Sequence, residues 1–98
     1  MDTRTFEYLL AVEREGSITK AAEACFVSQP ALTQKVKKLE EKLDVTIFQK
    51  EEEGLVPTPM GRIILNTALR ILHIEEEMER EIGEIRRAQR VKQEEQQI

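Results

Sequence analysis

The segment from residue 59 to about residue 90 constrains the possible folds of this chain more than any other feature. It contains no proline after Pro59, so nothing in it interrupts a helix. Its apolar residues recur every seven positions, at Ile64, Ile71, Met78 and Ile85. Thr58 and Pro59 supply the capping residue and the first-turn proline that are typical of a helix start. We therefore predict one helix over residues 59–90, roughly 45 Å long at ~1.5 Å per residue.

An apolar stripe on so long a helix needs a partner, because one small core cannot cover all of it. Packing back onto the chain's own domain would suit residues 63–72 but not the stretch beyond Glu75, where charged residues surround the stripe. We predict a dimerisation seam formed by Ile64, Ala68, Ile71, Ile74, Met78, Ile82 and Ile85. Residues 91–98 follow as a polar tail that we expect to be disordered.

The first 25 residues predict two shorter helices. An apolar stripe with helical spacing lies on residues 2–15, at Phe6, Leu9, Leu10 and Val12. Gly16 ends this helix, and Ser17 can cap the next one by accepting a backbone N–H bond. The alanines of the second helix are small enough to let another helix approach closely.

A third helix is predicted from Ser28 to about Leu43. Ser28 is a capping residue, and Pro30 falls in the first turn, where its missing N–H costs nothing. The apolar positions have helical spacing and are Leu32, Val36, Leu39 and Leu43. The opposite face carries Thr33, Gln34, Lys37 and Lys38.

Two short strands are predicted next, over residues 46–50 and 54–57, with a turn at Glu51–Gly54. Pro57 restricts the second strand to a sheet edge. The whole order predicts a mainly α fold: a winged helix-turn-helix of three helices and a two-stranded wing over residues 1–58, followed by a long dimerisation helix over residues 59–90.

Charge and composition restrict the function. The net charge of −4 argues against binding to nucleic acid, yet residues 28–39 contain three lysines and no Asp or Glu. A solvated helix face is the simpler explanation of such a cluster when charge is taken alone. Cys25 is the only cysteine, which excludes an internal disulfide and a cysteine-rich metal site. No apolar run is long enough for a membrane span and no signal-peptide pattern opens the chain, so we expect a cytoplasmic protein.

A helix-turn-helix gives the lysine cluster a function. The major groove of B-DNA is ~12 Å wide and admits one helix, which needs short polar groups near its N-terminal end and cations along its flank. The polar groups here are Gln29, Thr33 and Gln34, and the cations are Lys35, Lys37 and Lys38. A glutamine can pair with N6 and N7 of adenine.

Several motifs occur in the order known from one protein family. They are Ala11-Val12, Glu15-Gly16-Ser17, Ala21-Ala22-Glu23, Val27-Ser28-Gln29-Pro30-Ala31-Leu32, Leu39-Glu40-Glu41, Leu43, Phe48, and Thr58-Pro59 with Gly61. With these motifs, residues 6–72 resemble the N-terminal domain of LysR-type transcriptional regulators. The resemblance implies a winged helix-turn-helix whose linker helix pairs antiparallel with its counterpart in a homodimer. It also implies double-stranded promoter or operator DNA, with an imperfect palindrome, as the partner.

The resemblance further implies roles for individual residues. Base edges and the groove floor would be approached by Gln29, Pro30, Ala31, Thr33 and Gln34. Phosphates would be contacted by Thr19, Lys20, Ser28, Lys35 and Lys38, and Lys50 matches a wing arginine. Gln34 replaces a frequent base-reading arginine. Glu51–Glu53 makes the wing tip acidic, so we predict a weak or absent wing contact.

Typical members of this family carry a second, ligand-sensing α/β domain that is not present in these residues. We expect the chain to be either an excised domain or a naturally short protein, and its polar tail favours excision. A small-molecule effector would require that second domain, and so would pairing of dimers into tetramers.

Enzymatic and metal-binding functions have almost no support in the sequence. Capping explains Ser17 and Ser28, and the single histidine, His73, is expected on a surface or at an interface. We therefore expect no enzyme, no cofactor and no metal. The alternative function is a dimeric protein-interaction module with little affinity for DNA, which the net charge of −4 and the acidic wing favour.

Overall fold

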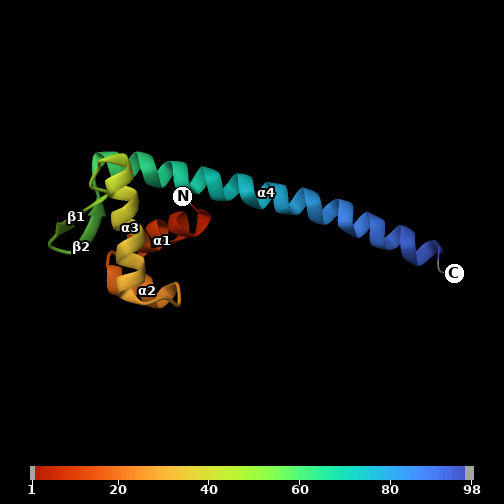
Figure 1. Ribbon diagram of the computed structural model, residues 1–98, viewed down its shortest axis with the longest axis horizontal. Helices are drawn as coiled ribbons and strands as arrows, with labels where there is room; N and C mark the ends of the chain where they lie inside the picture. Colours follow the sequence, from red (N-terminus) through yellow and green to blue (C-terminus); the bar gives the residue numbers. More distant parts are fainter. Residues whose placement is uncertain (1, 97–98) are drawn as a thin grey trace.

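The computed structural model describes residues 2–96 and has six elements: α1 (Thr3–Glu15), α2 (Ile18–Ala24), α3 (Gln29–Leu43), β1 (Phe48–Glu51), β2 (Gly54–Pro57) and α4 (Pro59–Gln96). In Figure 1 the first five elements form a small head, from which α4 projects as a rod. The molecule accordingly measures 65 × 24 × 22 Å along its principal axes. The predicted winged helix-turn-helix with a long following helix is confirmed. None of the helices described in residues 2–96 combines the length and the apolar character needed to cross a membrane.

Capping residues set the helix boundaries. The hydroxyls of Ser17 and Ser28 each accept a 3.2 Å hydrogen bond from the backbone N–H three residues later, as predicted. Gly16 adopts a left-handed φ of 68°, which ends α1. Asp2, which we placed inside the first helix, is instead its N-cap and accepts a 3.0 Å bond from the backbone N–H of Thr5.

The core of the head forms around α1, which contacts α2, α3 and α4. The largest fully buried side chains are Leu9, Val12, Leu32, Ile47 and Leu65. Ala21 and Ala22 are buried as well, so α2 packs closely, as their small size predicts. Of the apolar positions on α3, Leu32, Val36 and Leu39 are buried, whereas Leu43 in the last turn is 43% exposed.

The first strand begins at Phe48, two residues later than predicted, because the preceding backbone groups bond to other elements. The N–H of Ile47 donates to the carboxylate of Glu40 (2.8 Å), and its carbonyl accepts from the N–H of Thr58 (2.9 Å). The hydroxyl of Thr58 also donates to the carbonyl of Thr46. These bonds join the end of α3 to the start of α4 and occupy both backbone groups of Ile47 and the carbonyl of Thr46.

The first turn of α4 lies directly against the chain at Ile47. The hydroxyl of Thr58 accepts a 2.9 Å bond from the N–H of Gly61, which completes the predicted cap. A Cβ atom on Gly61 would lie only 2.0 Å from the carbonyl oxygen of Ile47. Glycine at this position therefore permits the close approach that fixes where α4 leaves the head.

Two predictions for α4 need correction. Ala68, assigned to the dimerisation seam, is 0% exposed because it packs into the core of its own head. The helix also continues past Arg90 to Gln96, so residues 91–96 are helical rather than disordered. The physical reason is that the residues after Gly83 include no proline or glycine and are mostly good helix formers. The remainder of the predicted tail, residues 97–98, lies outside the described residues.

Candidate nucleic-acid interface

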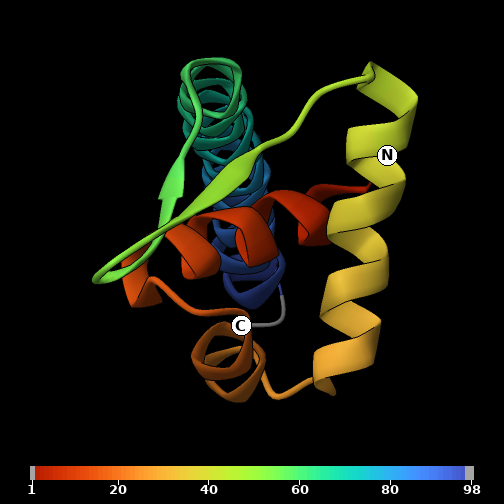
Figure 2. The same ribbon diagram turned by 90° about the vertical axis from the view of Figure 1, so that its left-hand side faces the viewer.

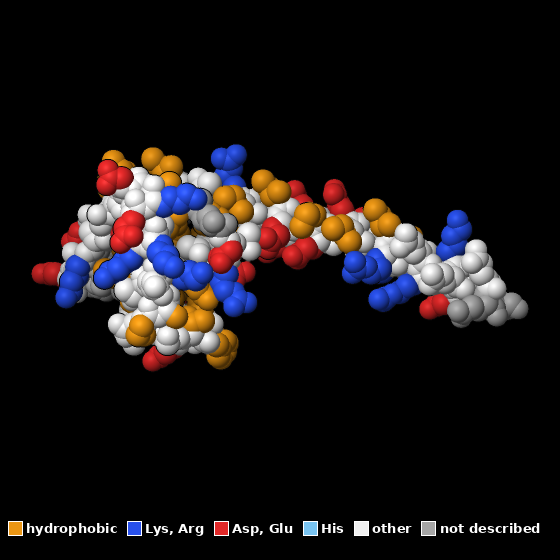
Figure 3. All heavy atoms as spheres, in the orientation of Figure 1, with side chains coloured by type: hydrophobic (Ala, Val, Ile, Leu, Met, Phe, Trp, Pro, Cys, Tyr) orange, Lys and Arg blue, Asp and Glu red, His pale blue; other side chains and the backbone are white. Residues whose placement is uncertain are grey.

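The outward face of α3 is polar near its N-terminal end and basic beyond it. Burial of Leu32, Val36 and Leu39 fixes the rotation of the helix and turns the residues between them outward. These outward residues line an open hollow formed by Gln29, Pro30, Thr33, Gln34, Lys37, Lys38 and Glu41. Figure 3 shows Lys and Arg side chains gathered over this part of the head. The face thus combines uncharged hydrogen-bonding groups with cations, as groove binding requires.

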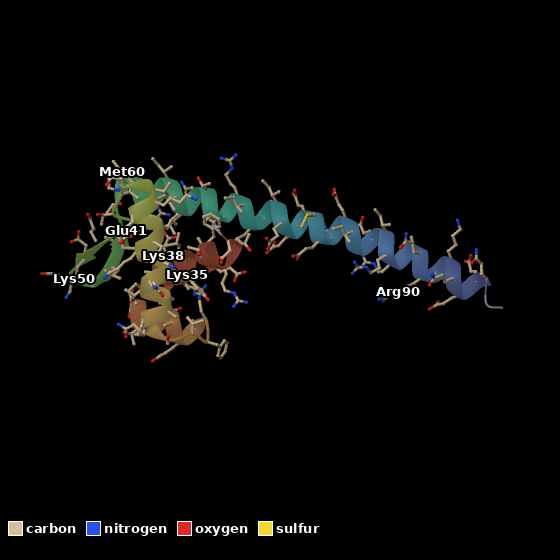
Figure 4. The ribbon with its side chains drawn as sticks, in the orientation of Figure 1. Lys35, Lys38, Glu41, Lys50, Met60 and Arg90 are labelled. Atoms are coloured by element: carbon tan, nitrogen blue, oxygen red, sulfur yellow. The ribbon has the colours of Figure 1, made fainter. Side chains whose placement is uncertain are left out.

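A second group of lysines lies along the flank of α3. Lys35, Lys38 and Lys42 border a hollow together with Asp2, and the Lys35 ammonium lies 3.5 Å from the Asp2 carboxylate. Figure 4 places Lys35 and Lys38 along α3, with Glu41 further toward its C-terminal end. The Thr5 backbone N–H and then its hydroxyl hold the pKa of Asp2 below its usual range, and Lys35 contributes less. Asp2 is therefore an anion that competes with phosphate for Lys35.

The N-terminal ends of α2 and α3 meet through one side-chain contact. The hydroxyl of Thr19, in the first turn of α2, donates a 3.0 Å hydrogen bond to Oε1 of Gln29, the first residue of α3. The cap residues Ser17 and Ser28 directly precede these two helices, so both ends of the contact are anchored. The turn between the helices thus brings together two side chains for which the sequence predicts separate roles, a phosphate contact for Thr19 and a base contact for Gln29.

The structure places most of the predicted DNA-binding residues on one side of the head. Those on α2 and α3 or at the cap of α3 are exposed, except for half-buried Thr33: Thr19, Lys20, Ser28, Gln29, Pro30, Ala31, Gln34, Lys35 and Lys38. Lys50 is also exposed but lies apart from them, on the wing (Figure 4).

The wing is fixed in place but carries an acidic tip. In the antiparallel pair Lys50 lies opposite Leu55, and Glu52 and Glu53 form the turn. The N–H of Leu55 donates a 2.9 Å bond to the carbonyl of Gly16, which ties the wing to the end of α1. Figure 2 shows α3 and the wing on opposite sides of α1. A phosphate backbone approaching the wing would meet Lys50 beside several carboxylates. These carboxylates repel phosphate and so weaken the attraction between Lys50 and the DNA backbone.

Two residues near the site were not among those predicted from the sequence. Glu41 lines the hollow on α3 beside Lys37, which was predicted as a flank cation, and its helical spacing from Lys38 was the signal that could have identified it. Asp2 lies against Lys35 although 33 positions separate them in the sequence. No local pattern reports such a contact, because it depends on how α1 packs across α3.

Metal binding would depend on the other histidine, cysteine and carboxylate side chains. Within residues 2–96 no group of three or more His, Cys, Asp or Glu side chains is placed to hold a metal ion. His73 lies 3.0 Å from Glu77, one helical turn away on α4. Cys25 is half-buried next to the core.

The apolar stripe of α4 remains uncovered beyond the head. Ile64 and Ile71 are half-buried against the core, but the residues that follow are exposed: Ile74, Met78, Ile82 and Ile85. Met78 is 51% and Ile85 62% exposed. Figure 3 shows hydrophobic side chains in a row along one side of the rod. A solvated helix with such a row has an apolar face that a partner could cover.

Comparison with protein families and curated proteins gives consistent matches. Residues 3–62 match the family described as "Bacterial regulatory helix-turn-helix protein, lysR family". The chain is 37% identical over 84 residues to the uncharacterized HTH-type transcriptional regulator YcgK of Bacillus subtilis (strain 168), which covers 86% of this chain and 26% of that protein. It is 37% identical over 76 residues to the HTH-type transcriptional regulator ClcR of Pseudomonas putida, covering 78% and 26%. The chain thus spans about a quarter of the length of these relatives.

Solved structures with the same fold include complexes with DNA. The CbnR DNA-binding domain in its DNA complex superposes with a TM-score of 0.73 at 32% identity, covering 80% of this chain and 90% of that one. The BenM DNA-binding domain bound to benA site 1 DNA gives a TM-score of 0.80 at 29% identity, covering 87% and 96%. Helix-turn-helix, wing and long helix therefore occur together in those proteins as they do here.

Proposed function

Because the chain belongs to the lysR family of bacterial regulatory helix-turn-helix proteins, we propose that it binds operator DNA sequence-specifically, as the homodimeric DNA-binding part of a transcriptional regulator. The observation that carries the proposal is the outward face of α3, which presents uncharged polar groups over a hollow with lysines along its flank. Relatives of the same fold have been solved in complex with DNA, which supports DNA as the partner of this chain. Residues 1–58 form the DNA-binding unit in this proposal.

The proposal divides the exposed residues by chemistry. Base edges are read from the N-terminal half of α3, by Gln29, Pro30, Ala31, Thr33 and Gln34. Phosphates are neutralised or hydrogen-bonded by Lys20, Ser28, Lys35 and Lys38, and Lys50 contributes less because of the acidic tip. Ser28 caps α3 as an acceptor, so its own hydroxyl proton remains available for a phosphate oxygen. The N-terminal end of α3 adds a partial positive charge beside that phosphate.

Two copies would pair through α4. The exposed residues of the seam are Ile74, Met78, Ile82 and Ile85, with Ile64 and Ile71 at its border with the head. A two-fold axis across paired rods presents two α3 helices in opposite directions, which matches an imperfect palindrome. We place the dimer in the cytoplasm, on promoter DNA. Response to a small molecule belongs to segments that the longer relatives possess.

DNA specificity is tested by selecting duplexes from a random pool and measuring affinities by fluorescence anisotropy at two salt concentrations. Binding to the selected duplex should exceed binding to random DNA by about 10³-fold or more. Gln29→Ala should lower this ratio, whereas Lys35→Ala should weaken both affinities alike and flatten the salt dependence. Equal affinity for selected and random DNA would contradict the proposal and favour the protein-interaction module.

Dimerisation is tested by placing charges on the seam away from the head. Met78→Glu with Ile85→Glu should give monomers in sedimentation velocity, because a partner helix would bury four carboxylates against apolar side chains. Leu69→Glu is the matched control, since Leu69 is 54% exposed but lies about 200° around the helix from Ile71. If the double variant sediments as the unaltered protein does, another surface holds the dimer.

A further inference from the structure

We propose that Thr19 is a positioning residue that sets which base edge Gln29 reads. This inference rests on the proposed function and concerns its base-reading step. It starts from the 3.0 Å bond in which the Thr19 hydroxyl donates to Gln29 Oε1. Both side chains are exposed on the face assigned to DNA, so the bond is not part of the core.

The hydroxyl of Thr19 has one proton, and this decides what it can do. While that proton is donated to Gln29, it cannot also be donated to a phosphate oxygen, which is only an acceptor. Ser17 and Ser28 differ, because their hydroxyls accept backbone N–H bonds and keep their own protons free. The phosphate role that the sequence suggested for Thr19 is therefore replaced, in this arrangement, by a role toward Gln29.

The bond restricts the amide of Gln29. A free glutamine amide can rotate to present either its oxygen or its NH₂ group to a base. With Oε1 held by Thr19, the NH₂ group and its two donors are turned away from Thr19. Both residues stand on helices with hydroxyl-capped ends, so neither backbone readily moves to release the bond.

A fixed donor gives a testable base preference. In the major groove guanine, adenine and thymine each offer an acceptor, whereas cytosine offers only its N4 amino donor. The NH₂ group of Gln29 would thus meet a second donor at cytosine and reject it. Adenine remains compatible, because its N7 can accept from the NH₂ group while Oε1 stays bound to Thr19. Without the Thr19 hydroxyl, the amide can turn its oxygen toward cytosine.

The experiment measures affinities for four duplexes that differ only at the base pair read by Gln29. That pair is identified as the position whose discrimination is lost in Gln29→Ala. Thr19→Val removes the hydroxyl with little change in shape, and we expect discrimination against cytosine there to fall on the order of tenfold. Thr19→Ser should restore it. Thr19→Val made in the Gln29→Ala background should have no further effect at this position.

Controls separate this role from a phosphate contact. Lys20→Ala, next to Thr19 on α2, should weaken binding to all four duplexes alike. If Thr19→Val behaves in the same way, or leaves all four affinities unchanged, the positioning role is wrong while the proposed function stands. If the unaltered protein itself shows no preference at any position, the proposed function fails first, and this inference fails with it.

Discussion

Replacing Gly61 with alanine should destabilise the protein although alanine is the better helix former. The added Cβ would lie 2.0 Å from the carbonyl oxygen of Ile47, and that oxygen also accepts the 2.9 Å bond from the N–H of Thr58. Backbone atoms hold this contact on both sides, so a flexible side chain cannot relieve it. The first turn of α4 must therefore move away from Ile47.

The size of the effect follows from the interactions that such a movement disturbs. Two hydrogen bonds join this turn to its surroundings, from the N–H of Thr58 and from the N–H of Gly61. Weakening both costs about 1–3 kcal/mol, and overpacking of a tight contact adds about 1–3 kcal/mol. The higher helix propensity of alanine offsets about 1 kcal/mol of this destabilisation. The free energy of unfolding should therefore fall by about 1–5 kcal/mol.

The assay is urea unfolding followed by circular dichroism at one fixed protein concentration, because a dimer's stability depends on concentration. Gly83→Ala is the matched control in the same helix, since a Cβ there meets nothing closer than 3.6 Å. The control should be more stable than the unaltered protein by about 0.5–1 kcal/mol. If both variants gain stability, the close approach of α4 to Ile47 is refuted.

Two further predictions concern the ends of the short helices. Phe26 follows α2 with a left-handed φ of 58°, and its side chain is 95% exposed. Phe26→Gly should therefore raise the melting temperature, because glycine relieves about 1 kcal/mol of left-handed backbone strain. A lower melting temperature would show that the Phe26 ring makes stabilising contacts. Asp2 caps α1 with a pKa held below its usual range, so its contribution to stability is present above the ordinary carboxyl pKa and is lost as the pH falls through the lowered value. Asp2→Asn keeps a capping side chain that does not titrate. As the pH is lowered through this range, the melting temperature of the unaltered protein should therefore fall more steeply than that of Asp2→Asn. Parallel plots of melting temperature against pH would be evidence against the cap.

The sequence predicted features that depend on local chemistry. Ser17 and Ser28 mark the helix starts because a serine hydroxyl directly before a run of helix-forming residues typically caps the helix. The apolar stripe of α4 likewise follows from spacing alone. The face of α3 was predictable because Leu32, Val36 and Leu39 fix its rotation.

Features that depend on packing between distant segments were not predictable. The strand begins at Phe48 because Ile47 bonds to Glu40 and Thr58, which no local pattern reveals. Ala68 shares the spacing of the seam, yet the head covers it, since the boundary between core and free stripe depends on where α4 leaves the head. The same reasoning applies to the contact between Asp2 and Lys35, whose partners meet only after α1 and α3 pack.

The central claim is that α3 enters the major groove with its polar and basic face toward the bases. The most direct measurement is an NMR titration of the ¹⁵N-labelled protein with a selected duplex, following each backbone amide. We expect the largest shift changes from Ser28 to Lys38 and at Lys20, with small changes at the wing tip. Unchanged α3 signals at saturating duplex, with the large changes confined to α4 or to Glu51–Glu53, would contradict the claim.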